Sequence, residues 1–307
     1  MEQGSQTYSF LIGEDDADER VDKFLAKELC DLSRSYIQKL LKEDRVLLAG
    51  KPVKANYKLK EEDEITFTIP PMKELAVEAE NIPLNILYED EDLIFINKPK
   101  DMVVHPCAGR YSGTLVNGLL YHCKDELSGI NGVLRPGIVH RIDKDTTGVL
   151  VICKNDKAHH HVADQLKVHS ITRKYRAIVQ GIVKEDGVVD APIGRSPKDR
   201  KKMAINEKNG KRAVTHYRVL EHLKGKYTYI ECQLETGRTH QIRVHMASLH
   251  HPLLGDTTYG PAANPFHLEG QCLHAMVLGL EHPATGEYIE CEAPLPEYFE
   301  EMLRKLR

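Results

Sequence analysis

The chain has 307 residues and a formal net charge of −4, with 41% hydrophobic and 29% charged residues. At about 150 residues per domain, this length suggests roughly two globular domains. No stretch approaches the roughly 18 apolar residues of a membrane span, and the polar residues 1–10 lack the apolar core of a secretory signal. We therefore expect a cytoplasmic protein without a membrane part.

The cysteines give no sign of a metal site or a disulfide framework. They are seven in number and scattered, at positions 30, 107, 123, 153, 232, 272 and 291, and no C-x-x-C pair occurs among them. The run of three histidines at 159–161 does not suggest metal either, because three adjacent residues cannot share one helix face. We expect no bound metal.

Positive charge is concentrated in two segments, although the chain as a whole is acidic. Residues 20–60 hold eleven Lys and Arg against five Asp and Glu, and residues 195–212 hold eight against two. Such local patches are typical of proteins that contact a polyanion, and two solvated surfaces are the alternative. Charge alone leaves both interpretations open.

Residues 1–17 are expected to be a mobile polar lead, and residues 18–78 a small α+β module. Two apolar faces at helical spacing predict two helices in this module, one with Val21, Phe24, Leu25 and Leu29 and the next with Ile37, Leu40 and Leu41. Short strand-like pieces follow and end at Pro70-Pro71. We expect a linker at 79–85 and a larger domain at 86–307.

The small module resembles a known RNA-binding domain. The runs D-K-F-L, S-R-S-Y-I-Q-K-L-L-K, V-L-L-A-G-K-P-V-K and Y-K-L-K-E-E-D-E-I are similar to those of the S-four-like (alpha-L) domain. That domain packs two helices on a small sheet and presents a basic helical face to RNA. The resemblance therefore implies RNA contacts from Arg34, Lys39 and Lys42. A generic small domain that binds protein is the alternative.

The larger domain is predicted to be an α+β domain on a largely antiparallel sheet, because strands outnumber helices. Four segments have the apolar runs or the alternation of strands, at residues 93–96, 148–153, 175–180 and 227–234. Two segments have helical character, at residues 159–166 and 239–249. Thr239 is expected to cap the second of these helices.

The densest polar cluster is G-I-V-H-R-I-D-K-D-T-T-G, residues 137–148, directly before a predicted buried strand. Active-site loops commonly occupy such positions on a rigid scaffold. The cluster offers two carboxylates, Asp143 and Asp145, beside Arg141 and Lys144. A nearby guanidinium favours an ionised carboxylate, which can act as nucleophile or general base. A charged surface turn is the alternative.

A second cluster is L-E-T-G-R-T-H-Q-I-R-V-H, residues 234–245. It supplies two arginines, Arg238 and Arg243, and two histidines. Arg243 follows Thr239 by one helical turn and is expected to face an acidic partner, whereas Arg238 is expected to contact RNA. A capped helix with a structural ion pair is the alternative interpretation.

Together the motifs of the larger domain resemble the RluA/RluD family of pseudouridine synthases. The matching blocks, in family order, are N-K-P at 97–99, H-R-I-D-K-D-T-T-G at 140–148, K-Y-R-A at 174–177, T-G-R-T-H-Q-I-R-V-H at 236–245 and L-H-A at 273–275. The run V-V-H-P and the S-four-like module are most similar to the RluD-like branch, which modifies large-subunit ribosomal RNA. Ile142, Thr147 and Cys107 depart from the usual leucine, serine and glycine, but none removes a group that the reaction needs.

The resemblance implies a role for each matching residue. Asp143 matches the catalytic aspartate, and Arg243 matches the basic residue that pairs with it. Tyr175 matches the tyrosine that stacks on the base, and Arg141 matches the arginine that fills the gap left when the uridine flips out. Leu273 matches an apolar wall of the base pocket.

The implied reaction is the isomerisation of uridine within structured RNA. A stacked uridine must first flip out, at a cost of about a few kcal/mol. The N1–C1′ bond then breaks, the uracil turns, and C5 joins C1′. Asp143 either attacks C1′ or removes the C2′ proton to give a glycal, and the sequence leaves both routes open. Because the isomerisation is redox-neutral, no cofactor is expected.

Two other functions are weighed against this one. A non-catalytic RNA-binding or ribosome-assembly factor could keep the same fold, although Asp143, Tyr175 and Arg243 are all present. A glycosidase or nucleoside hydrolase would use Asp143 with Asp145, but their spacing does not fix opposite faces of a sugar. The leading hypothesis is a monomeric enzyme that acts on large-subunit ribosomal RNA.

Overall fold

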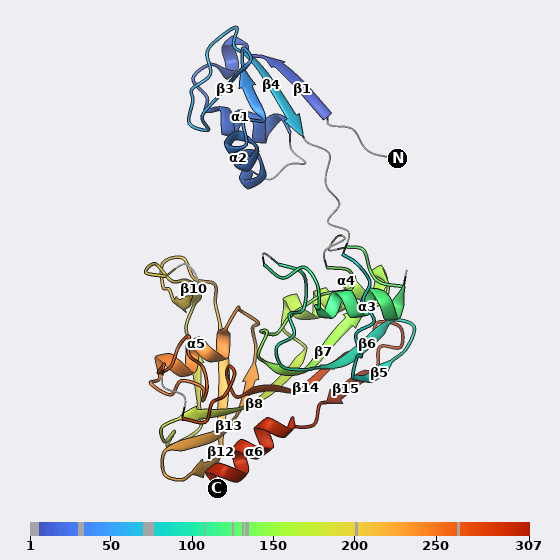
Figure 1. Ribbon diagram of the computed structural model, residues 1–307, viewed down its shortest axis with the longest axis vertical. Helices are drawn as coiled ribbons and strands as arrows, with labels where there is room; N and C mark the ends of the chain where they lie inside the picture. The colour runs from blue at the N-terminus through green and yellow to red at the C-terminus, as the bar shows by residue number, and fades with distance from the viewer. Residues whose placement is uncertain are drawn as a thin grey trace. The chain divides into compact units, whose positions relative to one another are not determined.

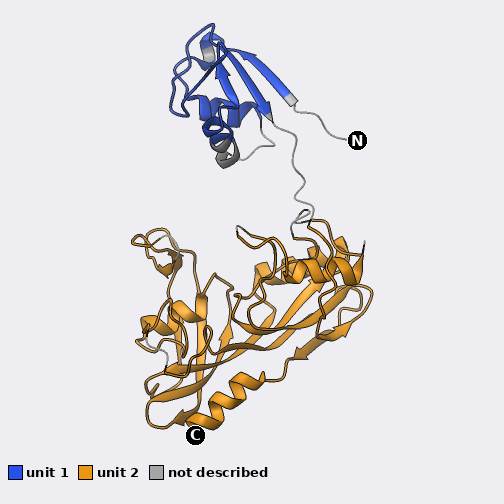
Figure 2. Cartoon of the chain, viewed as in Figure 1, with its two compact units in different colours: residues 1–74 blue, residues 75–307 orange. Residues whose placement is uncertain are grey.

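The computed structural model describes residues 6–29, 34–69, 77–107, 109–124, 126–130, 132, 135–199, 202–262 and 265–307. The chain divides into two compact units, residues 1–74 and 75–307, which Figure 2 colours separately. Each unit has its own hydrophobic core. In the described ranges, no helix combines the length and the apolar character that crossing a bilayer requires.

The smaller unit packs two helices on a four-stranded antiparallel sheet (Figure 1). Its helices are α1 (Val21–Glu28) and α2 (Arg34–Lys42), and its sheet has the order β1 (Gln6–Leu11), β4 (Glu64–Ile69), β2 (Val46–Leu48) and β3 (Lys51–Pro52). The predicted core residues Phe24, Leu25, Ile37 and Leu40 are buried against Phe67 of β4. The helical periodicity therefore identified this core correctly.

The start of the chain differs from the expected mobile lead. Residues 6–11 form β1, which pairs with β4 along its whole length, and residues 14–16 form a short 3-10 turn, η1. Ile12, directly after the strand, is 2% exposed in the core of the small unit. In this strand Tyr8 and Phe10 alternate with polar residues, and their rings lie near Phe67 and Phe24, while the backbone pairs with the edge of β4.

The larger unit is built on a nine-stranded sheet. Its strands are β5 (Ile86–Glu89), β6 (Leu93–Lys98), β7 (Thr147–Cys153), β8 (Thr172–Gln180), β9 (Gly187–Asp190), β12 (Val214–Leu223), β13 (Tyr227–Leu234), β14 (Leu273–Glu281) and β15 (Tyr288–Glu292). The order is β5-β6-β7-β14-β8-β13-β12-β9, and β15 pairs with β14. Among these described strands only β7 and β14 run parallel, so the expected largely antiparallel sheet is confirmed.

Helices cover both faces of this sheet (Figure 1). They are α3 (Leu115–Cys123), α4 (Asp156–Val168), α5 (Gln241–Ser248) and α6 (Glu297–Leu306). Successive side chains of β8 point to opposite faces of the sheet. Ala177 and Val179 belong to the core that includes α3 and α4, whereas Ile178 packs with Phe299 of α6. The central strands are therefore held on both sides and form a rigid base for the loops at their ends.

Residues 79–85, expected as a linker, lie against α3 in the larger unit. Glu80 donates its backbone N–H to Asn117 O at 2.9 Å, and Asn117 Nδ2 donates to the carbonyl of Glu78 at 2.8 Å. A Cβ at Gly118 would lie 3.0 Å from Leu84 Cδ2, so the glycine makes room for this segment. The boundary between the units accordingly falls at residue 74 and not after residue 78.

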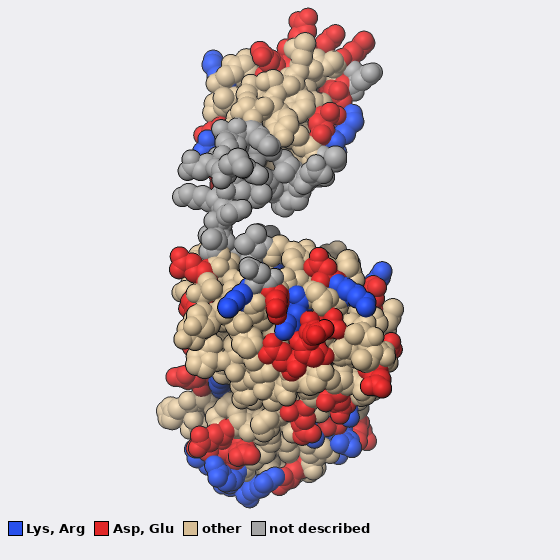
Figure 3. Space-filling view, turned by 90° about the vertical axis from the view of Figure 1, so that its right-hand side faces the viewer, with Lys and Arg blue, Asp and Glu red and all other residues tan. Residues whose placement is uncertain are grey.

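The second basic segment forms a hairpin of β10 (Ile193–Arg195) and β11 (Met203–Ile205), with Arg195, Lys198 and Lys211 exposed. On the face of the chain drawn in Figure 3, Asp and Glu side chains gather on part of the larger unit. Basic and acidic side chains are therefore concentrated in different parts of the surface, although the net charge of −4 is small.

The glycine that ends the first polar cluster has a steric role. Gly148 has φ +108°, and a Cβ built there would lie 2.1 Å from the backbone oxygen of Ala275 on β14. We expect Gly148→Ala to lower the free energy of unfolding of the larger unit by at least about 3 kcal/mol, because a backbone clash adds to the conformational strain. Urea unfolding measures the loss.

Gly225→Ala is the matched control for this substitution. Gly225 has φ +60°, but no atom lies within 4 Å of the position that a Cβ would take there, so only the left-handed backbone conformation is strained. We expect a cost of about 1–2 kcal/mol at this position. Equal losses for the two substitutions would show that the close approach of β7 and β14 is unimportant.

Candidate active site

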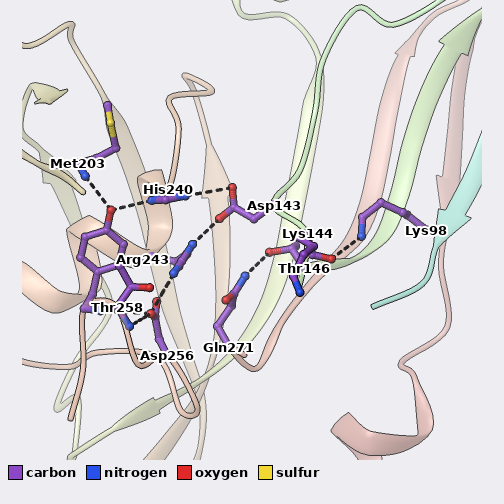
Figure 4. Close-up of polar contacts among 11 residues, drawn as sticks. Lys98, Asp143, Lys144, Thr146, Met203, His240, Arg243, Asp256, Thr258 and Gln271 are labelled. Atoms are coloured by element: carbon purple, nitrogen blue, oxygen red, sulfur yellow. Dashed lines mark hydrogen bonds and ion pairs between the residues drawn. The ribbon is translucent and has the colours of Figure 1, made fainter. Parts of the chain in front are cut away.

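Asp143 lies in the loop before β7, where one guanidinium bridges it to a second carboxylate (Figure 4). Arg243 Nη1 donates to Asp143 Oδ2 at 3.0 Å. The same side chain donates through Nε and Nη2 to Asp256 Oδ2 and Oδ1, at 2.7 and 3.0 Å. The side chain of Asp143 is 20% exposed, whereas that of Arg243 is 8% exposed. Of these two linked charged groups, the carboxylate of Asp143 is therefore the more accessible to a ligand.

Arg243 keeps its charge although it is buried. Burial opposes the charged form, but the hydrogen bond and charge of Asp256, followed by those of Asp143, raise the pKa of Arg243. Asp256 is itself fixed by backbone N–H groups of Thr258 and Tyr259, at 2.9 and 3.2 Å. The predicted pairing of Arg243 with an acidic partner thus extends to a second, buried carboxylate that no motif indicated.

His240 faces the other oxygen of Asp143. Its Nε2 lies 3.8 Å from Asp143 Oδ1, and its Nδ1 lies 2.7 Å from the hydroxyl oxygen of Tyr259. That oxygen accepts the backbone N–H of Met203 at 2.9 Å, so the hydroxyl proton is available for Nδ1 (Figure 4). Burial lowers the pKa of His240. A neutral His240 that accepts at Nδ1 carries its proton on Nε2, directed at Asp143.

The helix α5 begins differently from the prediction. Its N-cap is His240, with φ 58° in the left-handed region, and not Thr239. The N-cap makes no side-chain hydrogen bond; instead Gln241 Oε1 fixes the turn before the helix, because it accepts the backbone N–H of Arg238 at 2.9 Å and the hydroxyl of Thr236 at 2.8 Å. The left-handed turn at His240 places the imidazole beside Asp143, and such a conformation in a non-glycine residue is often found at functional sites.

Lys98, the lysine of the N-K-P motif, stabilises the loop that carries Asp143 through hydrogen bonds. Its ammonium is fully buried and donates to three backbone carbonyls: Pro99 at 2.6 Å, Met102 at 2.9 Å and Lys144 at 2.9 Å. Burial lowers the pKa of Lys98 to about 7. Gln271 Nε2 holds the same loop through Thr146 Oγ1 at 3.0 Å. Two of the three residues that follow Asp143, Lys144 and Thr146, are therefore held in place by buried side chains.

Two cavities flank Asp143. The larger one measures about 480 Å³, and its lining includes the predicted residues Asp143, Tyr175, Leu273, Arg141 and Arg238. The smaller one measures about 320 Å³ and is also lined by Asp143, Arg141 and His240, together with Arg243. The carboxylate thus lies between a compartment with an aromatic wall and a second polar compartment.

The remaining predicted residues fall into two groups. Tyr175 on β8 and Leu273 on β14 are 8% and 4% exposed, and burial raises the pKa of Tyr175. Lys42 is exposed at the end of α2 in the smaller unit. The side chains of Arg34 and Lys39 lie outside the described residues. The structure therefore brings the predicted residues of the larger domain together, whereas in the smaller unit it describes the side chain of Lys42 but not those of the other two.

One group of described residues has the composition of a metal site. Asp90, Asp92 and His282 have ligand atoms within 4.8 Å of one another. The oxygens of Asp90 already accept from the hydroxyl of Tyr88, from two backbone N–H groups and from His282 Nε2, at 2.6 to 2.8 Å. The group closes the turn between β5 and β6, and none of its members lines the two cavities.

His140 lies in the same loop as Asp143, where its imidazole is a neutral hydrogen-bond acceptor. Its Nε2 accepts the backbone N–H of Val151 at 3.0 Å, and burial of the imidazole together with the charge of Arg173 lowers its pKa to about 3. In the unfolded chain a histidine titrates near about 6.5. Between these values the unfolded state binds one more proton than the folded state, so acidification favours unfolding.

The stability contributed by His140 is present in full above the unfolded pKa and decreases as the pH falls below it. We expect His140 alone to account for a loss of about 2 kcal/mol in the free energy of unfolding between pH 7 and pH 5. Urea unfolding of the wild type and His140→Gln at both pH values measures it. The variant should lose less stability than the wild type on acidification, and an identical loss in both proteins would contradict the role assigned to His140.

Comparisons with known proteins agree with this arrangement. The family model described as RNA pseudouridylate synthase matches residues 92–248, and the S4 domain model matches residues 19–65. An uncharacterized RNA pseudouridine synthase of Bacillus subtilis is 54% identical over 96% of either chain. A protein of Zymomonas mobilis named ribosomal large subunit pseudouridine synthase D is 47% identical over 94% of this chain and 93% of its own length.

A solved structure shows the same catalytic fold. The human RNA pseudouridylate synthase domain containing 1 protein aligns with a TM-score of 0.57 at 28% identity, over 71% of this chain and 86% of that one. The matched family region contains Asp143, Tyr175 and Arg243. On these grounds the chain belongs to the RNA pseudouridylate synthase family and is an RNA pseudouridine synthase with an S4 domain near its N-terminus.

Proposed function

We propose that this enzyme isomerises specific uridines of large-subunit ribosomal RNA, with Asp143 as its catalytic carboxylate. The observation that carries the assignment of Asp143 is its position between the two cavities, where Arg243 binds one of its oxygens at 3.0 Å and His240 faces the other at 3.8 Å. Relatives named ribosomal large subunit pseudouridine synthase D support the choice of RNA. We also propose that the enzyme acts as a monomer in the cytoplasm.

The larger cavity suits a flipped uridine. Tyr175 offers an aromatic face to the uracil ring, and Leu273 closes the pocket with an apolar wall. Arg141 is exposed at the edge of both cavities, where it can occupy the space that the nucleotide leaves in the RNA. The base then turns against these walls while the sugar stays next to Asp143.

The carboxylate contributes a fixed negative charge at the sugar. Positive charge develops at C1′ while the N1–C1′ bond breaks, and the carboxylate of Asp143 stabilises it. Because Arg243 keeps this carboxylate in place, no reorganisation is needed. Asp143 either forms a bond to C1′ or accepts the C2′ proton, and the bond from C5 to C1′ follows. The ester to C1′ breaks as this bond forms, or the abstracted proton returns to C2′. C5 then releases its hydrogen as a proton and N1 takes up a proton from water, so the isomerisation balances without a co-reactant.

The test uses a large-subunit ribosomal RNA transcript that carries tritium at C5 of its uracils. Formation of the C5–C1′ bond expels this hydrogen, so released label counts turnovers. We expect release by the wild type without added metal or cofactor. Tight RNA binding without any release would reject isomerisation of this RNA, and free uracil among the products would identify a hydrolase.

The smaller unit is proposed to contribute RNA affinity through Arg34, Lys39 and Lys42. Deletion of residues 1–74 removes this unit and leaves the contact between Glu78 and Asn117 intact. We expect weaker binding of the transcript and a salt dependence of log Kd that is flatter by about 2, as three lost phosphate contacts require. Filter binding over a series of KCl concentrations measures it, and an unchanged slope would assign the unit to protein binding.

A further inference from the structure

Arg173 is a buried arginine that forms no ion pair with a carboxylate of the described residues. Its residue is 6% exposed on β8, two positions before Tyr175, and it lines the larger cavity. Nη2 donates to the backbone carbonyl of Glu235 at 2.8 Å, but the buried Nε has no hydrogen-bond partner within the described part of the chain. A buried charge is costly unless it is paired, so an arginine of this kind indicates a ligand that brings the opposite charge.

The surroundings of Arg173 add positive charge. Arg238 and Lys167 line the same cavity, and Arg238 also donates to a backbone carbonyl, that of Arg212, at 2.9 Å. The one carboxylate in the lining is Asp143, whose charge Arg243 already compensates. Among the described residues, the lining of this cavity therefore has more cationic than anionic side chains.

The backbone makes room for the guanidinium. A Cβ at Gly237 would lie 2.6 Å from Arg173 Nη1, so a larger residue at that position would displace the guanidinium. Burial lowers the pKa of Arg173, and the proximity of Arg238 adds to this effect. Both effects would be relieved by an anion in the cavity, because it would stabilise the two guanidinium groups at once.

We propose that Arg173, Arg238 and Lys167 form a phosphate-binding subsite, which holds a backbone phosphate of the RNA next to the target uridine. A nucleotide that enters the cavity brings its phosphates with it, since they are bonded to the ribose that must reach Asp143. A guanidinium fork binds two phosphate oxygens at once and so fixes position as well as charge. This subsite rests on the proposed function, in which the cavity receives a flipped uridine.

The test is the salt dependence of RNA binding, with the ribosomal RNA transcript as the probe. We expect Arg173→Gln to weaken binding about tenfold in 0.1 M KCl and to reduce the slope of log Kd against log[KCl] by about 0.7, the value for one lost phosphate contact. Lys174→Gln is the matched control. It removes the same charge at the next position of β8, where the side chain points to the other face of the sheet, and should leave the slope unchanged.

Two further variants keep the test informative if Arg173→Gln lowers the melting temperature. Arg173→Lys retains the charge and should retain the slope. Gly237→Ala retains every charge but displaces the guanidinium, and should weaken binding severalfold. Unchanged affinity and slope in Arg173→Gln and Gly237→Ala would overturn the subsite, as would loss of turnover with an unchanged slope, which would assign Arg173 to an oxygen of the uracil.

The binding measurement separates this subsite from the proposed function. It requires no turnover, so it can be carried out in the Asp143→Asn background. Tritium release is measured in parallel with the enzyme that keeps Asp143. A slope that depends on Arg173, with no release by that enzyme, would support the phosphate subsite and reject the isomerisation. Tritium release with a slope that does not depend on Arg173 would do the reverse.

Discussion

Asp143→Asn is expected to abolish release of tritium from the C5-labelled transcript, with a fall in turnover on the order of 10⁴-fold or more. The substitution keeps the size of the side chain and one oxygen that can accept from Arg243, but it removes the charge and the ability to form an ester or accept a proton. RNA affinity should stay within a few-fold, because the cations that line the cavity are unchanged.

The control for this substitution is Asp145→Asn. Asp145 lines the smaller cavity but not the larger one, and Lys144 Nζ lies 3.5 Å from its carboxylate. We expect turnover to stay within about tenfold of the wild type, as is typical for loss of one partly exposed ion pair. Retained turnover in Asp143→Asn would refute the catalytic role of that residue. Equal losses in both variants would favour a mechanism with two carboxylates.

Arg243→Met is expected to damage both activity and folding. The methionine leaves Asp256 without its bidentate partner, although that side chain is only 1% exposed. Breaking a buried ion pair from one side typically costs about 3–5 kcal/mol, and urea unfolding should show a loss of this size in the larger unit. Turnover should fall about a thousandfold or more, a size typical of the loss of a preorganised donor, because the position of Asp143 is no longer fixed.

Arg238→Met is the control for Arg243→Met, because it also removes one positive charge from a cavity lining but breaks no buried ion pair. Arg238 lines the larger cavity, but its guanidinium is partly exposed and donates to a backbone carbonyl. We expect a change in the free energy of unfolding below about 1 kcal/mol, together with weaker RNA binding. If Arg243→Met were as stable as Arg238→Met, the bridge to Asp256 would not be a structural contact.

Much of the fold could be predicted from the sequence, because its periodicities match what the structure buries. The apolar run 93–96 became the buried centre of β6, and the helical face with Phe24 and Ile37 became the core of the smaller unit. β1 was missed, since an edge strand is stabilised by backbone pairing that side chains do not reveal. The segment at residues 79–85 was assigned as a linker because its contact with α3 depends on tertiary structure.

In the candidate site, too, some residues could be predicted from the sequence and others depend on the tertiary structure. Asp143 and Arg243 stand in dense motifs and could be named, and their separation of 100 residues in the chain ends in a contact of 3.0 Å. Asp256 and Tyr259 lie in a loop without a motif that identifies them, so their contacts with Arg243 and His240 emerge from the fold. Arg173 was overlooked because a single arginine in a strand carries no sign of burial. Its position two residues before Tyr175, on the same face of β8, was the available clue.

The loop of Asp143 is already fastened in the protein by itself, through Lys98, Gln271 and Arg243. A binding site that is shaped in advance leaves most of the adjustment to its partner. The RNA must therefore unstack and bend toward the carboxylate, and uridines in flexible loops or bulges meet this demand more readily than those inside a regular helix. We therefore expect the choice among uridines to depend on the local deformability of the RNA as well as on its base sequence.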